Sequence, residues 1–212
     1  MIISHRHRYI FFAIPKTGTH SVRQALRQHM GPQDLEQVRL FVQKRFPFPE
    51  FADIPHGHIS AQQIRPVLGE AQYSTYFKFA FVRNPFARFV SFCAFMTRES
   101  NDFAIQPRSV MRHVITTPNL LNHLLCRPQY EFITDAAGQI AIDYVGRNEE
   151  MQTSYDSITT KLGIPGQTLE HTNRSQHHPW REYYDAGLAD LVGKFYRRDL
   201  ELFGYGLDDH AT

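Results

Sequence analysis

The sequence predicts an α/β fold of three layers, in which helices flank a mainly parallel central sheet. Short apolar runs, rich in aromatic and β-branched residues, alternate with longer segments whose apolar residues recur at helical spacing. Each apolar run also ends in a turn that leads into a helix, which is the pattern of strands joined by helical crossovers. No internal repeat or linker divides the chain, so we expect a single domain over residues 1–212.

The first strand and the first helix lie near the beginning of the chain. Residues 9–14 form an unbroken apolar run, which predicts a strand buried on both faces. Residues 21–30 place apolar side chains at helical spacing before a Gly-Pro pair ends the helix. A second helix is expected over residues 34–45, and the proline-rich residues 46–51 then form an extended connector.

The middle of the chain repeats this alternation. A modest helix is expected over residues 60–68, and residues 76–82 form a second strongly apolar strand. An Asn-Pro pair ends that strand and begins a helix over residues 86–97. Residues 103–127 are predicted to be mostly helical, with a new segment beginning at Pro118.

The last third of the chain adds one strand and two helices. Residues 140–145 are a third strand candidate, and the helix that follows ends near Leu162. The clearest helix is the last, because its apolar side chains recur at helical spacing from Trp180 to Phe195.

The composition is that of an ordinary soluble globular protein, with 42% hydrophobic and 21% charged residues. A formal net charge of +2 is far from the basic surface of a dedicated nucleic-acid binder, so we expect no nucleic-acid partner. No stretch reads as a secretory signal or a membrane span, and the two cysteines fit neither a metal site nor a disulfide framework. We therefore expect a soluble, cytoplasmic protein that holds no metal.

A candidate anion site lies in the loop Pro15-Lys16-Thr17-Gly18-Thr19-His20-Ser21, between the first strand and the first helix. Such a loop aims backbone N–H groups and a helix N-terminus at one point, and its glycine permits a close approach. Lys16 adds a positive charge, and the three hydroxyl residues add donors. The alternative is an ordinary turn in which Thr19 or Ser21 caps the helix. In the Walker pattern a glycine directly precedes the lysine, whereas here Lys16 comes first, which disfavours nucleoside triphosphate hydrolysis.

Arg83 and Ser91 form a second candidate site. Arg83 stands at the end of the second strand, and ligands of open α/β sheets bind at the carboxyl ends of the strands. Ser91 lies two turns into the following helix, where it can face the same cavity, and an arginine with a hydroxyl suits a second, separate phosphate. Taken alone, Ser91 is more simply a helix-surface serine and Arg88 a solvated charge. Only the pairing with the loop favours a functional role.

Both motifs resemble the donor-binding motifs of sulfotransferases that use 3′-phosphoadenosine 5′-phosphosulfate (PAPS). The first motif is Pro-Lys-Thr-Gly after a strand, and the second is Arg-Asn-Pro followed, after five residues, by Ser. The resemblance extends to residues 144–149, 171–175 and 196–205, and the nearest branch is the carbohydrate sulfotransferase-like proteins. It implies a P-loop nucleotide-binding architecture and transfer of a sulfuryl group from PAPS to an acceptor hydroxyl, with a carbohydrate as the expected acceptor.

The resemblance also implies roles for the motif residues. Lys16, Thr17, Gly18, Thr19, His20 and Ser21 would hold the 5′-phosphosulfate. Lys16 would also stabilise charge on the bridging oxygen as the sulfur–oxygen bond breaks. His20 is a departure from the family pattern, because such loops usually carry a hydroxyl residue there.

The remaining implied roles concern the nucleotide. Arg83 and Ser91 would hold the 3′-phosphate, and Arg174 and Ser175 would lie on a loop that closes over the nucleotide. Asn148 would lie near the adenine, although it replaces a residue that is often aromatic in the family.

The segment His56-Gly57-His58 supplies candidates for a general base. In related carbohydrate sulfotransferases a His-Gly-His segment provides the group that takes the proton of the acceptor hydroxyl, and this sequence keeps that spacing. An ordinary histidine pKa near 6.5 suits the task. His58 is the first choice and His56 the second. Because the chain has 12 histidines, a close pair also arises by chance.

Two other functions stay open. A nucleotide-dependent kinase or triphosphatase of P-loop fold would need Mg²⁺ ligands and a Walker loop, and neither is evident. A non-catalytic module would bind anionic glycans or nucleotides through its arginines. We expect the acceptor pocket to involve residues 32–56 and 98–135. Four arginines there either favour an anionic acceptor or lie on solvated helix faces: Arg98, Arg108, Arg112 and Arg127.

Overall fold

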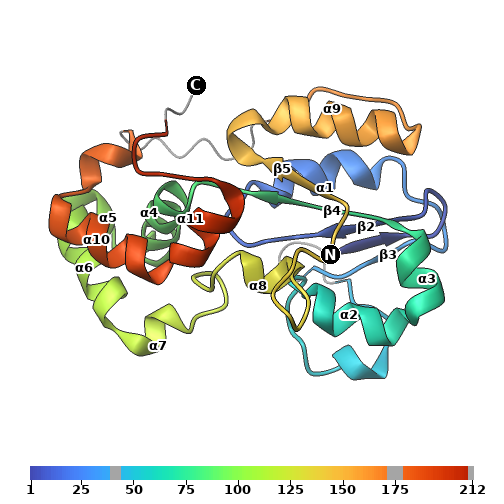
Figure 1. The fold of residues 1–212 in the computed structure, drawn as a ribbon, viewed down its shortest axis with the longest axis horizontal. Coiled ribbons are helices and arrows are strands. Elements are labelled where there is room, and N and C mark those ends of the chain that lie inside the picture. The colour runs from blue at the N-terminus through green and yellow to red at the C-terminus, as the bar shows by residue number, and fades with distance from the viewer. Residues whose placement is uncertain (39–43, 171–178, 210–212) are drawn as a thin grey trace.

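The computed structural model describes residues 1–38, 44–170 and 179–209 and has an α/β fold (Figure 1). A five-stranded sheet with the order β3-β1-β2-β4-β5 crosses the molecule. Helices cover both faces of the sheet, which confirms the predicted α/β class with its flanking helices. The strands are β1 (Ile2–Ser4), β2 (Tyr9–Phe12), β3 (Leu35–Glu36), β4 (Phe77–Val82) and β5 (Tyr144–Arg147).

The sheet is mixed, and the prediction of a mainly parallel sheet is wrong for the side of the sheet that β1 and β3 form. The neighbours β2, β4 and β5 pair in parallel, whereas β1 is antiparallel to both β2 and β3. A tight turn joins β1 to β2, with Arg8 in the left-handed region at a φ of 54°, so these strands form a hairpin. Antiparallel neighbours can be joined in this way, whereas parallel ones need a longer crossover.

The prediction of a helix over residues 34–45 is wrong for the residues of this range that the structure describes. Leu35 pairs with Ile3 and Glu36 with Ile2, and Val38 forms an isolated bridge with Lys44. Backbone pairing with a distant strand therefore overrides the local helical spacing, and residues 39–43 lie outside the described part. The third predicted strand, over residues 140–145, corresponds to β5, which begins later, at Tyr144. The residue before it, Asp143, accepts a hydrogen bond from the Lys78 backbone N–H at 2.7 Å.

The helices form layers on the two faces of the central strands. One face is covered by α1 (Thr19–Arg27) and α9 (Met151–Leu162), and the other by α2 (Ala61–Leu68), α3 (Glu70–Thr75) and α8 (Tyr130–Ile133) (Figure 1). Side chains of β2 alternate between the two apolar layers, as a strand requires. Tyr9 and Phe11 pack on the α1 side, and Ile10 and Phe12 pack on the other. All four are fully buried, which confirms the prediction of a strand buried on both faces.

A third group of helices lies beside the sheet around its own core, which includes Phe89, Phe92 and Tyr196. The predicted last helix is broken, because residues 180–183 form a 3₁₀ turn and Asp185 caps a new helix by accepting from the Leu188 N–H at 2.9 Å. No helix of the described residues combines the length and the apolar character needed to cross a membrane. The helices are α4 (Pro85–Met96), α5 (Asp102–Ile105), α6 (Pro107–Thr116), α7 (Pro118–Leu121), α10 (Ala186–Phe195) and α11 (Arg197–Phe203).

Candidate functional site

The loop after β2 is folded by its own hydrogen bonds. Thr17 is fully buried and its hydroxyl donates to the Ile14 carbonyl at 3.0 Å, so this hydroxyl shapes the loop. Lys16 and Gly18 both have a left-handed backbone, with φ values of 65° and 77°. A lysine rarely adopts this conformation, and such strain persists only where the surroundings fix it. The loop therefore turns sharply before α1 begins at Thr19.

The N-terminus of α1 directly follows the loop, so the N–H groups of its first turn lie at the end of the loop. Its N-cap is Gly18, and none of the described side chains caps the helix, so the alternative of a cap by Thr19 or Ser21 is wrong. Uncapped N–H groups at a helix N-terminus attract an anion. Half-buried His20 lies in this first turn, where burial and Arg23 lower the pKa of its ring.

Asn148 closes the other side of the loop. Its Nδ2 donates to the Thr17 carbonyl at 3.2 Å. A side chain at Gly18 would come within 2.8 Å of that Nδ2 and would overlap the methyl group of Met151 at the start of α9. The glycine is thus required by close packing as well as by its positive φ.

Lys16 lies among cations. Its ammonium is 4.2 Å from the centroid of the Phe95 ring of α4, and the guanidinium of Arg98 is 4.3 Å from the same centroid. Burial lowers the pKa of Lys16, and the positive charges of Arg83, Arg88 and Arg98 act in the same direction, so that together they bring it to about 8. An anion bound here would relieve this repulsion.

Arg83 follows β4, at the edge where that strand ends. Gln129 fixes its backbone on both sides, because Oε1 accepts from the Arg83 N–H and Nε2 donates to the Arg83 carbonyl, each at 2.9 Å. Burial lowers the pKa of the Arg83 guanidinium, while the charge of Glu149 acts in the opposite direction. The Glu149 carboxylate is itself held by the Asn84 N–H at 2.7 Å and the Tyr205 hydroxyl at 2.8 Å.

Ser91 is half-buried on α4. Residues three or four apart on a helix share a face, so Arg88, Ser91 and Phe95 lie along one side of α4. Lys16 contacts that side at Phe95. The structure thus brings Lys16 and the Ser91 side of α4 together, while no described contact joins Ser91 to Arg83.

Arg88 is the functional candidate that the sequence reasoning missed. It is fully buried, so its interpretation as a solvated charge is wrong. Its Nε donates to the Pro15 carbonyl at 2.9 Å, and its Nη2 donates to the carbonyls of Leu125 at 3.1 Å and Arg127 at 2.8 Å. The sequence does carry one indication of a role for Arg88, because it lies three residues before Ser91 and therefore on the same face of the helix.

The histidine segment does meet the loop. His58 Nδ1 lies 2.5 Å from the Ala13 carbonyl, so Nδ1 carries the proton and Nε2 is left as the acceptor nitrogen. Burial lowers the pKa of His58 to about 3, which keeps the ring neutral near pH 7. The His56 ring centroid is 6.1 Å away, and His56 Nδ1 accepts from the His58 backbone N–H at 3.3 Å.

The remaining predicted residues have simpler outcomes. Arg174 and Ser175 lie outside the described residues. Cys93 and Cys126 are fully buried and burial raises the pKa of both thiols, so both are packed core residues. Within residues 1–38, 44–170 and 179–209, no three side chains of His, Cys, Asp or Glu are grouped as metal ligands would be.

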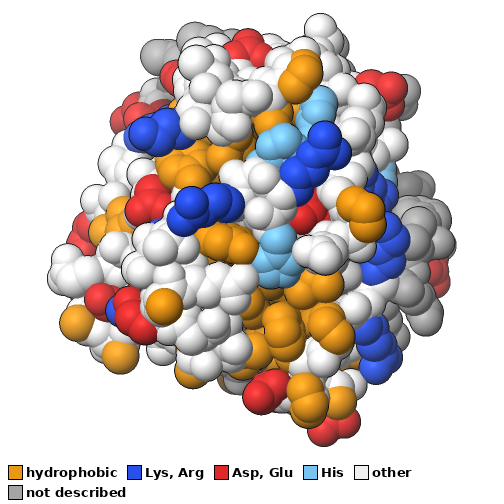
Figure 2. Space-filling view, turned by 90° about the vertical axis from the view of Figure 1, so that its right-hand side faces the viewer, with side chains coloured by type: hydrophobic (Ala, Val, Ile, Leu, Met, Phe, Trp, Pro, Cys, Tyr) orange, Lys and Arg blue, Asp and Glu red, His pale blue; other side chains and the backbone are white. Residues whose placement is uncertain are grey.

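The opposite end of the sheet carries a separate group of histidines. The turn before β2 places His5 Nδ1 2.7 Å from the Tyr76 hydroxyl and His7 Nε2 3.2 Å from the His29 carbonyl. Figure 2 views this end and shows histidine and cationic side chains above an apolar area. Because the strands β2 and β4 begin here and the candidate loop follows the other end of β2, these histidines are not part of the candidate site.

The loop, the uncapped helix and the cations around Lys16 lie at the carboxyl ends of parallel strands of an α/β fold, an arrangement that suits phosphate- or sulfate-type anions. The model of the sulfotransferase family matches residues 1–206. The chain therefore belongs to the sulfotransferase family, whose members transfer sulfuryl groups, and the predicted family resemblance is confirmed. Searches of curated proteins and of solved structures found no match.

Proposed function

We propose that this chain transfers the sulfuryl group of PAPS to an acceptor hydroxyl, which we expect to be on a carbohydrate. The supporting observation is the group of cations around Lys16, because burial and then these positive charges lower the pKa of the lysine to about 8. We further propose that one P-loop domain spanning residues 1–212 performs the reaction.

Two separate anion positions favour PAPS over ATP. The loop and the first turn of α1 offer N–H groups and Lys16 to the 5′-phosphosulfate. Arg83 and Ser91 lie farther along, after β4 and on α4, and suit the 3′-phosphate. Asn148, which is bonded to the loop, is proposed to lie near the adenine. The phosphates of ATP form one contiguous chain and would leave the second position empty.

The transfer needs positioning and charge stabilisation more than covalent help from the protein. The acceptor oxygen attacks sulfur as the bond between sulfur and the bridging phosphate oxygen breaks, and adenosine 3′,5′-bisphosphate leaves. Lys16 stabilises the charge that develops on the bridging oxygen. The acceptor proton goes to Nε2 of His58, the nitrogen not engaged with the Ala13 carbonyl.

The pKa of about 3 results mainly from the burial of the His58 ring within the protein. A bound phosphosulfate places negative charge beside the loop, and a nearby negative charge raises the pKa of a histidine. The same donor that supplies the sulfuryl group therefore makes His58 a better base. His56 is the second candidate.

Thermal unfolding with two nucleotides tests the donor assignment. Without Mg²⁺, adenosine 3′,5′-bisphosphate should stabilise the protein, by about 2.7 kcal/mol at 100 times its dissociation constant. ATP with Mg²⁺ should give no comparable effect. Stabilisation by ATP with Mg²⁺ alone would overturn the proposal in favour of a kinase or triphosphatase.

A second candidate function is a non-catalytic module that binds an anionic glycan or nucleotide. The low pKa of His58 favours it, because a histidine with a pKa of about 3 is a weak base. Transfer of label from PAPS to a panel of sugars, lipids and phenols separates the two functions. Nucleotide binding without any labelled product would support the module.

A further inference from the structure

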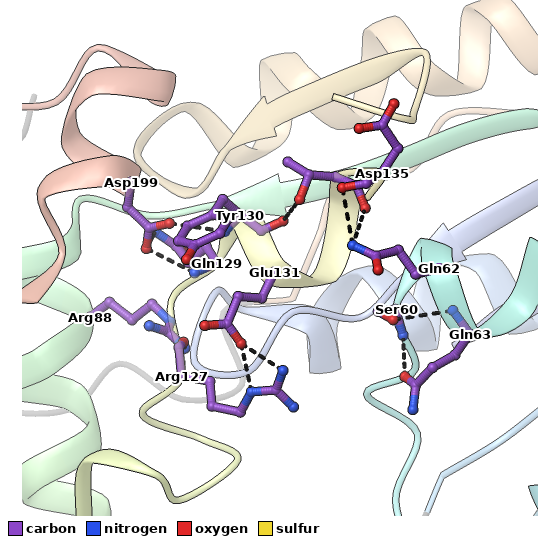
Figure 3. Close-up of polar contacts among 11 residues, drawn as sticks. Ser60, Gln62, Gln63, Arg88, Arg127, Gln129, Tyr130, Glu131, Asp135 and Asp199 are labelled. Atoms are coloured by element: carbon purple, nitrogen blue, oxygen red, sulfur yellow. Dashed lines mark hydrogen bonds and ion pairs between the residues drawn. The ribbon is translucent and has the colours of Figure 1, made fainter. Parts of the chain in front are cut away.

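A polar pocket of about 480 Å³ opens between the start of α2 and the segment around α8. This is the volume range of sites for small molecules. Figure 3 shows its two sides, with Ser60 and Gln63 at the start of α2 facing Arg127 and Glu131 across the gap. The side chains that matter for recognition are Gln62, Gln63, Arg127, Glu131, Asp135 and Arg198.

Both walls of the pocket are connected to the candidate loop through hydrogen bonds of neighbouring residues. The α2 wall begins at Ser60, two residues after His58, whose ring is bonded to the Ala13 carbonyl. The other wall begins at Arg127, whose carbonyl is bonded to Nη2 of Arg88, while Nε of the same side chain holds the Pro15 carbonyl. The pocket thus lies beside the residues that flank the loop.

The charges of the pocket are balanced within it. Arg127 forms an ion pair with Glu131, with the closest nitrogen and oxygen 2.6 Å apart. The guanidinium of Arg198 donates to the Gly138 carbonyl at 2.7 Å, and the carboxylate of Asp135 offers a negative charge to the same pocket. Two arginines therefore face two carboxylates, and the pocket has no net charge to attract an acid.

Two amides leave unused groups in the pocket. Nε2 of Gln62 donates to the carbonyls of Thr134 at 3.2 Å and Asp135 at 3.1 Å, while Oε1 of Gln63 accepts from the Ser60 N–H at 2.9 Å. Within the described part of the chain, Oε1 of Gln62 and Nε2 of Gln63 have no such partner. One acceptor and one donor remain, and a hydroxyl can engage both kinds of group.

We propose that this pocket holds the acceptor and that it takes an uncharged, hydroxyl-rich ring such as a sugar. The inference rests on the proposed function and narrows it. An acidic glycan would meet the carboxylates of Glu131 and Asp135, and the pocket has no excess of positive charge to offset that repulsion. A phenol has a single hydroxyl, so it would leave part of the unused amide groups of Gln62 and Gln63 without a partner. Arg127 is accordingly a paired residue of the pocket and does not present an isolated positive charge.

Binding of sugars is tested directly, without turnover. Saturation-transfer NMR with lactose, maltotriose and chitotriose should show contact with the protein, both alone and with adenosine 3′,5′-bisphosphate. A hyaluronan tetrasaccharide and 4-nitrophenol should show about tenfold weaker binding or none. Preference for either of these ligands would overturn the proposal. The sugar signals do not depend on PAPS, so a failure of the donor assignment is seen separately in the nucleotide titration.

Two variants test whether the sugar binds in this pocket. Gln62→Ala should weaken sugar binding about fivefold or more and raise the acceptor KM, with nucleotide binding unchanged. Glu131→Gln leaves Arg127 unpaired, and should therefore narrow the preference for the uncharged sugar over the hyaluronan tetrasaccharide about tenfold. The matched control is Gln28→Ala, at an exposed glutamine outside the pocket, which should change neither quantity. Unchanged sugar binding in both pocket variants would reject this location.

Discussion

Arg88 of α4 and Pro15 of the loop are joined by a hydrogen bond of 2.9 Å between Nε and the proline carbonyl. Because the same guanidinium also holds the Leu125 and Arg127 carbonyls, one buried side chain links the loop to the wall of the polar pocket. Its positive charge acts on the nearby carboxylate of Asp199, which in turn accepts from the Gln129 N–H at 2.8 Å (Figure 3). The loop, the end of β4 and α11 are therefore held by one buried network.

Replacing Arg88 by lysine should destabilise the fold. An ammonium cannot reproduce the fork that reaches three carbonyls, and the buried acceptors it loses stay unsatisfied. We expect a loss of about 3 kcal/mol in the free energy of unfolding, measured by urea denaturation. Arg112→Lys is the control, because its pair with Asp185 is partly exposed and should be worth no more than about 1 kcal/mol. Equal losses in the free energy of unfolding would show that the buried hydrogen bonds of Arg88 do not stabilise the fold more than an exposed ion pair does.

Replacing Gly18 by alanine should damage the loop more than its backbone conformation alone explains. A positive φ costs an alanine about 1 kcal/mol, and the new methyl group would also overlap Met151. Gly163→Ala separates the two effects, because Gly163 also has a positive φ, of 63°, but has no atom near the new methyl group. Both variants should lose stability, and only Gly18→Ala should lose binding of adenosine 3′,5′-bisphosphate in a calorimetric titration. Intact binding in that variant would remove the loop from the nucleotide site.

The central strands and the helices beside them could be predicted because local signals decide them. The apolar run of β4 and the proline at the start of α4 are visible within twenty residues of sequence. The strands β1 and β3 could not be predicted, because they exist only through pairing between residues such as Ile2 and Glu36. Their own sequences are short and carry no periodicity of two.

In the candidate site, too, local sequence signals predict some residues, whereas others depend on contacts between distant parts of the chain. Sequence motifs predict Lys16, Arg83 and Asn148 as site residues, and each lies in or beside the loop or at the end of a strand. Arg88 and Gln129 were not named as site residues, because their roles follow from burial and from partners far along the chain. Gln129 binds both backbone groups of Arg83, which is 46 residues away. No local pattern of residue types indicates such a contact.

Lys16→Met should stabilise the empty protein at pH 7 while abolishing nucleotide binding. The pKa of Lys16 falls from 10.5 to about 8 on folding, so the folded state disfavours its charge. This cost is present in full below pH 8 and disappears as the pH rises towards 10.5, where both states lose the proton. We expect a gain of about 1–2 kcal/mol at pH 7 that vanishes near pH 10.5, measured by thermal unfolding. Lys194→Met, on an exposed side chain, should show neither change.

His58→Asn should flatten the loss of stability in acid. The folded pKa of His58 is about 3, against 6.5 for an ordinary histidine, so only the unfolded state takes up this proton between those values. Stability linked to His58 is therefore complete above pH 6.5 and is lost as the pH falls towards 3. Asparagine keeps a donor for the Ala13 carbonyl but does not titrate. Unfolding curves from pH 7 to pH 4 should diverge between the two proteins, and parallel curves would contradict the low pKa.

The same variant tests the role of His58 in transfer. Asparagine keeps the bond to the Ala13 carbonyl and removes the ring nitrogen that would accept the proton, so the fold and nucleotide binding should persist. Loss of a general base costs about 10²–10⁴-fold in rate, and we expect labelled transfer from PAPS to fall by that factor. The control His56→Asn, one glycine away, should retain most of the activity. If the His58→Asn variant kept its normal turnover and the His56→Asn variant lost it, the base would be His56, whose ring centroid lies 6.1 Å from that of His58.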